Sequence, residues 1–253
     1  MKMIPEYEIK VKSLQKALEI LNCFAVKSSW GVTELSEYLG LNKSNVHNIL
    51  TTFTAMEYLK QDPETGKYQL GMALYTLSHA LGDELIIGNI AMPYMQELSD
   101  FSGERVYLGI PYKDEVIYIS STYPQESFYL MRTIAGERAK LYCTGIGKAM
   151  LAYLPEQLEF CLKEGLTAFT DYTITDPEKL REELALTRQR GYAVDNMEHE
   201  FGIKCVAMPI FNKQRKVEAA ISVSGPSLRF EEARIEELAQ ALAKKVRKIE
   251  ARL

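Results

Sequence analysis

The chain has 253 residues and a formal net charge of −4, with 47% apolar and 25% charged residues. This length allows two domains with a large core, and the balance of residue types is that of an ordinary globular protein rather than of a disordered or fibrous one. No apolar run approaches the roughly 20 residues of a membrane-spanning helix, and no signal-peptide core begins the chain, so we expect a cytoplasmic protein without a membrane partner.

Three segments near the N-terminus predict a small helical module. Residues 10–24 carry leucines at helical spacing and predict an amphipathic first helix. A short helix follows from Thr33 to Leu39, and the Thr33 hydroxyl is placed to accept from the free N–H groups at its start. Gly40 can adopt the turn that ends a helix, and a second helix begins at Lys43. Two helices joined by such a turn have the geometry of a helix-turn-helix.

The polar face of the second helix supports DNA binding. Its side chains are short, uncharged hydrogen-bonding groups, whereas a helix facing plain solvent usually carries Lys and Glu pairs. Short amide and hydroxyl groups suit a DNA groove, where they reach base edges and phosphates. An ordinary helical hairpin with a polar solvent face stays open as the alternative on this segment alone. The candidate DNA-binding residues here are Thr33, Lys43, Ser44, Asn45, His47, Asn48, Thr51 and Thr52.

A predicted β-hairpin comes directly after the second helix, over residues 60–70. Its Asp-Pro and Thr-Gly pairs form turns between two short extended arms. A helix-turn-helix followed by a hairpin is a winged helix, and Lys60 and Lys67 are placed to contact the phosphate backbone. The sequence therefore predicts a winged helix-turn-helix DNA-binding domain over residues 1–71.

The charge of this module limits what kind of DNA binding is expected. Residues 1–70 contain eight lysines against eight acidic residues, and the first arginine of the chain is Arg105. Because phosphate neutralisation supplies most of nonspecific affinity, this balance argues against a tight nonspecific binder. It is compatible with a specific dimeric regulator that uses a few well-placed lysines.

The rest of the chain predicts a connecting helix and a second domain. The helix spans residues 72–85, and its leucine stripe of Leu74, Leu77 and Leu81 could pack within its own domain or on a second subunit. Residues 86–253 combine strands in hairpins with helices gathered to one side, which predicts an α+β domain with an antiparallel sheet. The predicted strands include residues 106–112, 115–123 and 127–134, and a long helix from about residue 231 closes the chain.

A glycine pair in the second domain marks a candidate ligand site. An extended arm reaches Thr144, and Gly145-Ile146-Gly147 then opens a helix. Free N–H groups at a helix start attract anions, so a small carboxylate site is one interpretation and a merely tight turn is the other. The glycine spacing of nucleotide-binding loops is absent. Further on, Ser222 and Ser224 share one sheet face, which is either solvated or turned toward a ligand.

Several sequence blocks together resemble the IclR family of bacterial transcriptional regulators, over nearly the whole chain. The blocks are NKSNVHNILTTF, DPETGKYQLG, CTGIGKAMLA, RGYAVDNMEHEFGIKCVAMPIFN and AAISVSGP. The resemblance implies a winged helix-turn-helix followed by a GAF-like effector-binding domain. It also implies dimers through the DNA domains, often tetramers, and small organic effectors rather than catalysis. The effector contacts it implies are Met131, Ala139, Gly145, Ile146, Asp195, Ile203, Cys205, Ser222 and Ser224.

This chain departs from the family pattern at one effector contact and at one position of the second DNA-binding helix. Ala139 is smaller than the leucine often found there, and Asn48 replaces a common basic residue, so neither pocket size nor operator sequence carries over. We expect an organic-acid effector whose carboxylate lies at the helix start of residues 145–147. Ser222 and Ser224 would donate to it, and Asp195 would accept from a ligand hydroxyl.

The sequence thus favours a DNA-binding regulator, in our interpretation a repressor of a catabolic operon, with no cofactor and no metal. The alternative is a thiol or carboxylate hydrolase that uses Cys143 or Cys205 with Asp195. The cysteines lie far apart without a Cys-x-x-Cys pair, which favours free thiols over disulfides or zinc. They also lack a His-plus-acid neighbourhood, because we expect His199, between two glutamates, to face solvent.

Overall fold

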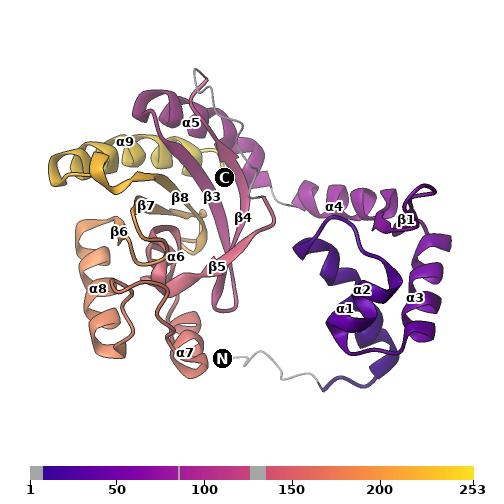
Figure 1. Ribbon diagram of the computed structural model, residues 1–253. Helices are drawn as coiled ribbons and strands as arrows, with labels where there is room; N and C mark the ends of the chain where they lie inside the picture. Colours follow the sequence, from indigo (N-terminus) through magenta and orange to yellow (C-terminus); the bar gives the residue numbers. More distant parts are fainter. Residues whose placement is uncertain (1–7, 85, 126–134) are drawn as a thin grey trace. The chain divides into compact units, whose positions relative to one another are not determined.

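The computed structural model describes residues 8–84, 86–125 and 135–253. It divides into two compact units, Met1–Glu84 and Leu85–Leu253 (Figure 1). Met131 and the predicted strand over residues 127–134 lie outside the described residues. Within the described ranges, no helix combines the length and apolar character that a membrane crossing requires.

The first unit is a helical module with a two-stranded hairpin. One buried cluster, which includes Ile20, Trp30, Leu35, Val46 and Leu50, holds its helices together. The two strands pair antiparallel. Trp30, in the loop between the first two helices, forms a β-bridge with Tyr68 of the second strand. The elements are α1 (Lys12–Val26), α2 (Val32–Leu39), α3 (Lys43–Ala55), β1 (Leu59–Gln61), β2 (Tyr68–Leu70) and α4 (Met72–Glu84).

The start of α2 corrects the predicted role of Thr33. The helix begins one residue earlier, so Thr33 lies inside its first turn and is exposed. The N-terminal cap is Gly31, whose N–H donates to the Glu34 carboxylate at 2.8 Å. The side chain of Asn42 caps α3 instead, accepting from the Ser44 N–H at 3.3 Å. The sequence argument failed because a glycine can cap a helix when an acid in the first turn reaches back to it.

The second unit is an antiparallel sheet of six strands in the order β5-β4-β3-β8-β7-β6. This confirms the predicted α+β class. The strands are β3 (Arg105–Tyr112), β4 (Glu115–Thr122), β5 (Arg138–Lys140), β6 (Ala193–Asn196), β7 (Ile203–Phe211) and β8 (Val217–Pro226). The helices are α5 (Ile86–Ser102), α6 (Gly145–Leu151), α7 (Pro155–Glu164), α8 (Pro177–Arg190) and α9 (Glu232–Glu250).

The prediction that the helices gather on one side of the sheet is wrong. One buried cluster joins α5 and α9 to the sheet, and a second joins α6, α7 and α8 to it (Figure 1). The central strand β8 shows the consequence, because Ile221 and Val223 belong to the first cluster and Ala220 to the second. Coverage on both faces explains why residues 219–225 of this strand are all buried.

The segment before α6 is also tighter than predicted. The predicted extended arm is the short strand β5, and Leu141–Cys143 form a turn of 3-10 helix before α6 begins at Gly145. A side chain on Gly147 would lie 2.3 Å from the carbonyl oxygen of Leu141. The glycine therefore lets the helix start pack directly against the preceding turn.

Candidate functional site

The polar residues of α3 form an exposed face. Val46 and Leu50 of this helix are buried, and this orientation turns the amide and hydroxyl side chains outward. Thr52 donates its hydroxyl to the backbone carbonyl of Asn48 at 2.8 Å, a bond within the helix. The predicted residues that are exposed here are Thr33, Lys43, Ser44, Asn45, His47, Asn48, Thr51, Thr52 and Lys60.

Lys67 differs from the other predicted DNA-binding residues because an acid neutralises it. Its Nζ lies 3.0 Å from Oε1 of Glu34, and Lys27 reaches the same oxygen at 3.1 Å. The hydrogen bond from the Gly31 N–H, followed by those from the two lysines, lowers the pKa of Glu34 to about 2. Lys67 thus holds the hairpin to α2, and Lys60 on β1 remains the exposed lysine of the hairpin.

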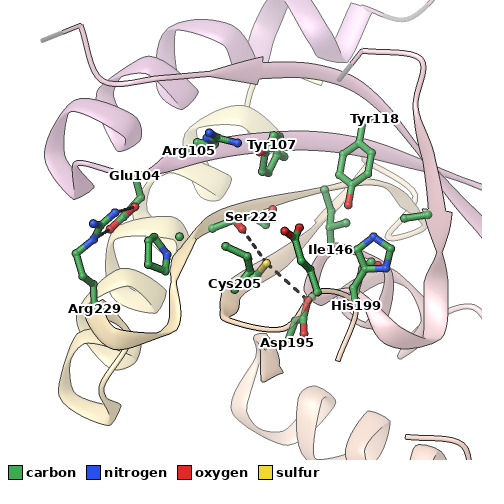
Figure 2. A pocket seen from close by; sticks show the side chains of 18 of the residues that line it. Glu104, Arg105, Tyr107, Tyr118, Ile146, Asp195, His199, Cys205, Ser222 and Arg229 are labelled. Carbon is green, nitrogen blue, oxygen red and sulfur yellow. Dashed lines mark hydrogen bonds and ion pairs between the residues drawn. The ribbon is translucent and has the colours of Figure 1, made fainter. Parts of the chain in front are cut away.

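A cavity of about 1300 Å³ lies over one face of the sheet, beside the start of α6, in the second unit (Figure 2). Eight of the nine predicted effector contacts line it, and the ninth, Met131, is outside the described residues. The eight are Ala139, Gly145, Ile146, Asp195, Ile203, Cys205, Ser222 and Ser224. The cavity therefore brings together residues from β5, α6, β6, β7 and β8 that lie far apart in the sequence.

Strand register places four of the lining residues in one row across the sheet. Asp195 pairs with Cys205, Cys205 with Ser224, and Ser224 with Arg105. Directly paired residues point to the same face of a sheet, so the four side chains share the cavity face. The Cys205 thiol lies 3.1 Å from the Ser224 hydroxyl and 3.8 Å from Oδ2 of Asp195. The serines of β8 thus face the pocket rather than solvent.

Asp195 is a buried acid at the inner end of this row, with 3% of its surface exposed. Its Oδ1 accepts a hydrogen bond from the Glu198 N–H at 2.8 Å. Burial raises the pKa of Asp195 to about 7, because its effect is larger than the lowering by that hydrogen bond. A carboxyl with this pKa can accept or donate a hydrogen bond near neutral pH.

A buried ion-pair network supports the turn that follows Asp195. Lys148 of α6 is 1% exposed, contacts Glu198 closely and lies 3.6 Å from the Glu183 carboxylate. Burial raises the pKa of Glu198, although the Lys148 charge opposes this. The lysine therefore holds α6 and α8 to the loop after β6, a role that had no signal in the sequence.

The start of α6 is partly satisfied by its own residues. The Thr144 hydroxyl accepts from the Gly147 N–H at 3.1 Å. A side chain on Gly145 would lie 3.1 Å from Cβ of Cys205 and 3.4 Å from Cβ of Asp195. Glycine at this position therefore allows close packing of the helix on the sheet, and Gly145 and Ile146 border the cavity.

Sequence reasoning missed the aromatic and cationic part of the lining. Tyr107 and Tyr118 meet edge to face with ring centroids 5.6 Å apart, and both line the cavity. Arginines also line the cavity. One of them, Arg229, donates two hydrogen bonds to Glu104, at 2.5 and 2.7 Å. Pairing in the sheet could have found Tyr107, which lies opposite Ser222, but only once the strand order was known.

The expectation that His199 faces solvent is wrong. The side chain is half-buried, lines the cavity, and its ring lies 5.4 Å from that of Phe169. The turn after β6 folds back over the sheet because Thr170 and Thr173 donate hydroxyl groups to carbonyls of Met197 and Glu198. Two flanking glutamates misled the sequence argument, since one of them is itself buried in the Lys148 network.

The chain matches two protein-family models. Residues 79–251 match the model described as "Bacterial transcriptional regulator IclR C-terminal", and residues 13–63 match the IclR helix-turn-helix domain. The chain is 36% identical over 238 residues to the "HTH-type transcriptional regulator XynR" of Escherichia coli, covering 91% of this chain and 94% of that one. It is 32% identical over 244 residues to the "Transcriptional repressor IclR" of the same organism, covering 95% and 89%.

A solved structure has the same arrangement of elements. The crystal structure of the Thermotoga maritima IclR protein is 31% identical to this chain, with a TM-score of 0.76. The match covers 96% of this chain and 98% of that one. The shared fold therefore includes both the helix-turn-helix unit and the unit that contains the cavity.

Proposed function

This chain belongs to the IclR family of transcriptional regulators, and from this premise we propose that it represses a catabolic operon until a small organic acid binds the cavity. Like the relatives to which it is similar, it is a DNA-binding transcriptional regulator and not an enzyme. The observation that carries the DNA-binding part is the exposed amide and hydroxyl face of α3.

We propose that α3 enters the major groove and that the hairpin contacts the backbone. Asn45 and Asn48 offer amides to base edges, while Lys43 at the helix start and Lys60 on β1 offer charge to phosphates. Lys67 contributes less, because its charge already pairs with Glu34. The name of the repressor relative supports the sign of regulation proposed here.

The proposed effector site is the cavity of the second unit. Its inner part combines the hydroxyls of Ser222 and Ser224 with the Asp195 carboxyl and a wall formed by Ile146 and Ile203. An apolar wall with a few convergent polar groups is the usual composition of a small-molecule site. Ala139 leaves more room than a larger side chain would, which fits an effector larger than a two- or three-carbon acid.

We further propose that the protein works as a homodimer or homotetramer. Apolar side chains of the first unit are exposed on α1 and α4, including Leu14, Leu18, Tyr75 and Leu77. Exposed apolar patches of this kind support contact with a second copy. Effector binding would then shift the equilibrium between arrangements of the paired DNA-binding units, of which one matches the half-site spacing.

Gel shifts with DNA from upstream of the gene and its neighbours test this function. Asn45→Ala/Asn48→Ala should abolish the shifted band, while Gln214→Ala, an exposed change in the turn between β7 and β8, should leave it intact. Organic acids added to the wild-type complex should release the DNA. Equal binding by both variants, or release by no acid that binds the protein, would contradict the proposal.

A further inference from the structure

The arginines that line the cavity differ in whether a carboxylate pairs with them. Arg229 pairs with Glu104, and Arg138 lies 3.4 Å from Glu115. Arg105, on β3, forms no ion pair with any carboxylate among the residues that the structure describes. A hydrogen bond with the Tyr107 hydroxyl and, more weakly, the charge of Glu200 raise the pKa of Arg105, and its guanidinium lies 5.6 Å from the centre of the Tyr123 ring.

Arg105 and Asp195 occupy opposite ends of the row across the sheet. Figure 2 shows Arg105 and Tyr107 at one side of the pocket and Asp195 at the other. Three strand-to-strand steps separate the two backbones, which corresponds to about 14 Å. Because side chains on strands stand roughly perpendicular to the sheet, the two head groups are about as far apart as the backbones, and a hydrogen bond of about 3 Å to each leaves about 8 Å for a ligand. Cys205 and Ser224 lie between them, and Tyr107 and Tyr118 form an aromatic wall beside the row.

The two ends suit different ligand groups. A carboxylate placed at the inner end would adjoin the Asp195 carboxyl, which packs against the start of α6. At the outer end it would meet the Arg105 guanidinium, which matches a carboxylate in charge and planar geometry. The lining also contains further acids, such as Asp100 and Glu200, so a second negative charge on the ligand would be repelled.

We infer that Arg105 sets the orientation and class of the effector: a monocarboxylic acid about 8 Å long, its carboxylate on Arg105 and a hydroxyl at its far end on Asp195. This inference rests on the proposed effector site and revises the expectation that the carboxylate lies at the start of α6. Ser224 lies between Arg105 and Cys205 in the row, where its hydroxyl would bond to polar substituents along the ligand.

Calorimetry on the full-length protein tests the inference with three probes. 6-Hydroxyhexanoate carries both groups, hexanoate lacks the hydroxyl, and hexane-1,6-diol lacks the carboxylate. We expect wild type to bind the hydroxy acid at least about tenfold more tightly than either one-ended probe, because each end adds a hydrogen bond to a charged or polar partner. Failure of the hydroxy acid to bind more tightly than the diol would overturn the inference.

Variants then separate Arg105 from a general charge effect. Arg105→Gln should reduce hydroxy-acid affinity about tenfold or more, to the level of the diol, and leave diol affinity unchanged. Arg138→Gln is the matched control, because it removes an equal charge from the same lining while its partner Glu115 already neutralises it. Arg105→Lys should retain part of the affinity. Equal losses in Arg105→Gln and Arg138→Gln would show that the carboxylate does not lie on Arg105.

The outcomes for the inference and for the proposed function are distinguishable. If Arg105→Gln keeps the wild-type affinity for the hydroxy acid while the wild type still binds and releases operator DNA, the regulator function stands and the orientation is wrong. If the variants behave as expected in calorimetry but wild type fails to bind operator DNA, the ligand assignment stands and the function is wrong.

Discussion

The Sγ atom of Cys143 lies 3.8 Å from Nδ1 of His199, although 56 residues separate them in the chain. A thiol beside an imidazole is the arrangement of a cysteine nucleophile, which the sequence alternative had lacked. The electrostatics oppose this role. Burial and the nearby Asp195 raise the pKa of Cys143 to about 12, and burial lowers the pKa of His199. Both groups therefore stay neutral, and the contact is one of packing.

The neutral thiol predicts slow alkylation of Cys143. With a pKa of about 12, its thiolate fraction at pH 8 is about a thousandfold below that of an ordinary cysteine. Labelling with iodoacetamide at pH 8, followed by mass spectrometry, should show modification of Cys143 slower by about that factor in the folded protein than in 8 M urea. Rapid labelling of Cys143 in the folded chain would mean an activated thiol and would revive the hydrolase alternative.

Asp195 predicts a fall in stability as the pH rises. In the folded chain its carboxyl keeps its proton up to about pH 7, whereas an unfolded aspartate loses it near pH 4. The folded state therefore binds the extra proton between these values, so the free energy of unfolding decreases through this window. Asp195→Asn should remove this contribution.

Calorimetric unfolding at pH 5 and pH 8 checks the Asp195 prediction. Relative to wild type, the variant should gain stability between the two pH values, on the order of 1–3 kcal/mol. The amide keeps an oxygen that can accept from the Glu198 N–H, so the loop itself is preserved. A difference that is the same at both pH values would show that the carboxyl is ionised throughout.

Lys148 predicts a large loss of stability on removal of its charge. Lys148→Met leaves two acids, Glu183 and Glu198, without the cation that they share. Breaking a buried pair in this way costs about 3–5 kcal/mol. The control is Lys245→Met, whose partner Glu97 is half exposed, and which should cost about 1 kcal/mol or less.

A double variant separates charge from packing at this site. Glu198→Gln added to Lys148→Met should recover part of the lost stability, because it removes the acid that would be left buried. Urea unfolding measures both steps. If the second substitution destabilised the protein further, the loss would reflect packing around the lysine stem rather than the unpaired charge.

Exposed leucines of the first unit predict a dependence of assembly on α1 and α4. Leu18 is 47% exposed and Leu77 is 54% exposed, so Leu18→Ser/Leu77→Ser should leave folding intact. We expect smaller species in sedimentation velocity and operator affinity reduced about tenfold or more, since each half-site alone binds weakly. Leu186→Ser, on α8 and 52% exposed, is the matched control. Unchanged assembly would assign the leucines to the surface of a monomer.

The absence of arginine from the first unit predicts an operator rich in A·T pairs. Arginine makes the commonest specific contact to guanine, whereas the Asn48 amide matches the edge of adenine. In selection from random DNA, Asn48→Ala should relax one adenine position by roughly 1–3 kcal/mol. Lys43→Ala should weaken all sites alike and flatten the salt dependence. Contacted half-sites dominated by G·C pairs would show that Lys43 recognises bases.

Local sequence patterns determined the helix-turn-helix and most element boundaries of this protein. The step between Val46 and Leu50 orients α3, and His47 and Asn48 between them are then exposed. Helix α8 has local signals at both ends, because Pro177 begins it and Gly191 follows it. Such signals lie within a few residues of the structure that they specify.

The cavity of the second unit was decided by tertiary structure. Family resemblance named Asp195, Cys205 and Ser224 one at a time, but their register with Arg105 exists only in the assembled sheet. A strand pattern gives the face of a residue and leaves its partner strand undetermined, because hydrogen bonds between distant strands carry no local signal. Burial, and with it the raised pKa of Asp195, likewise depends on helices that cover the sheet from elsewhere in the chain.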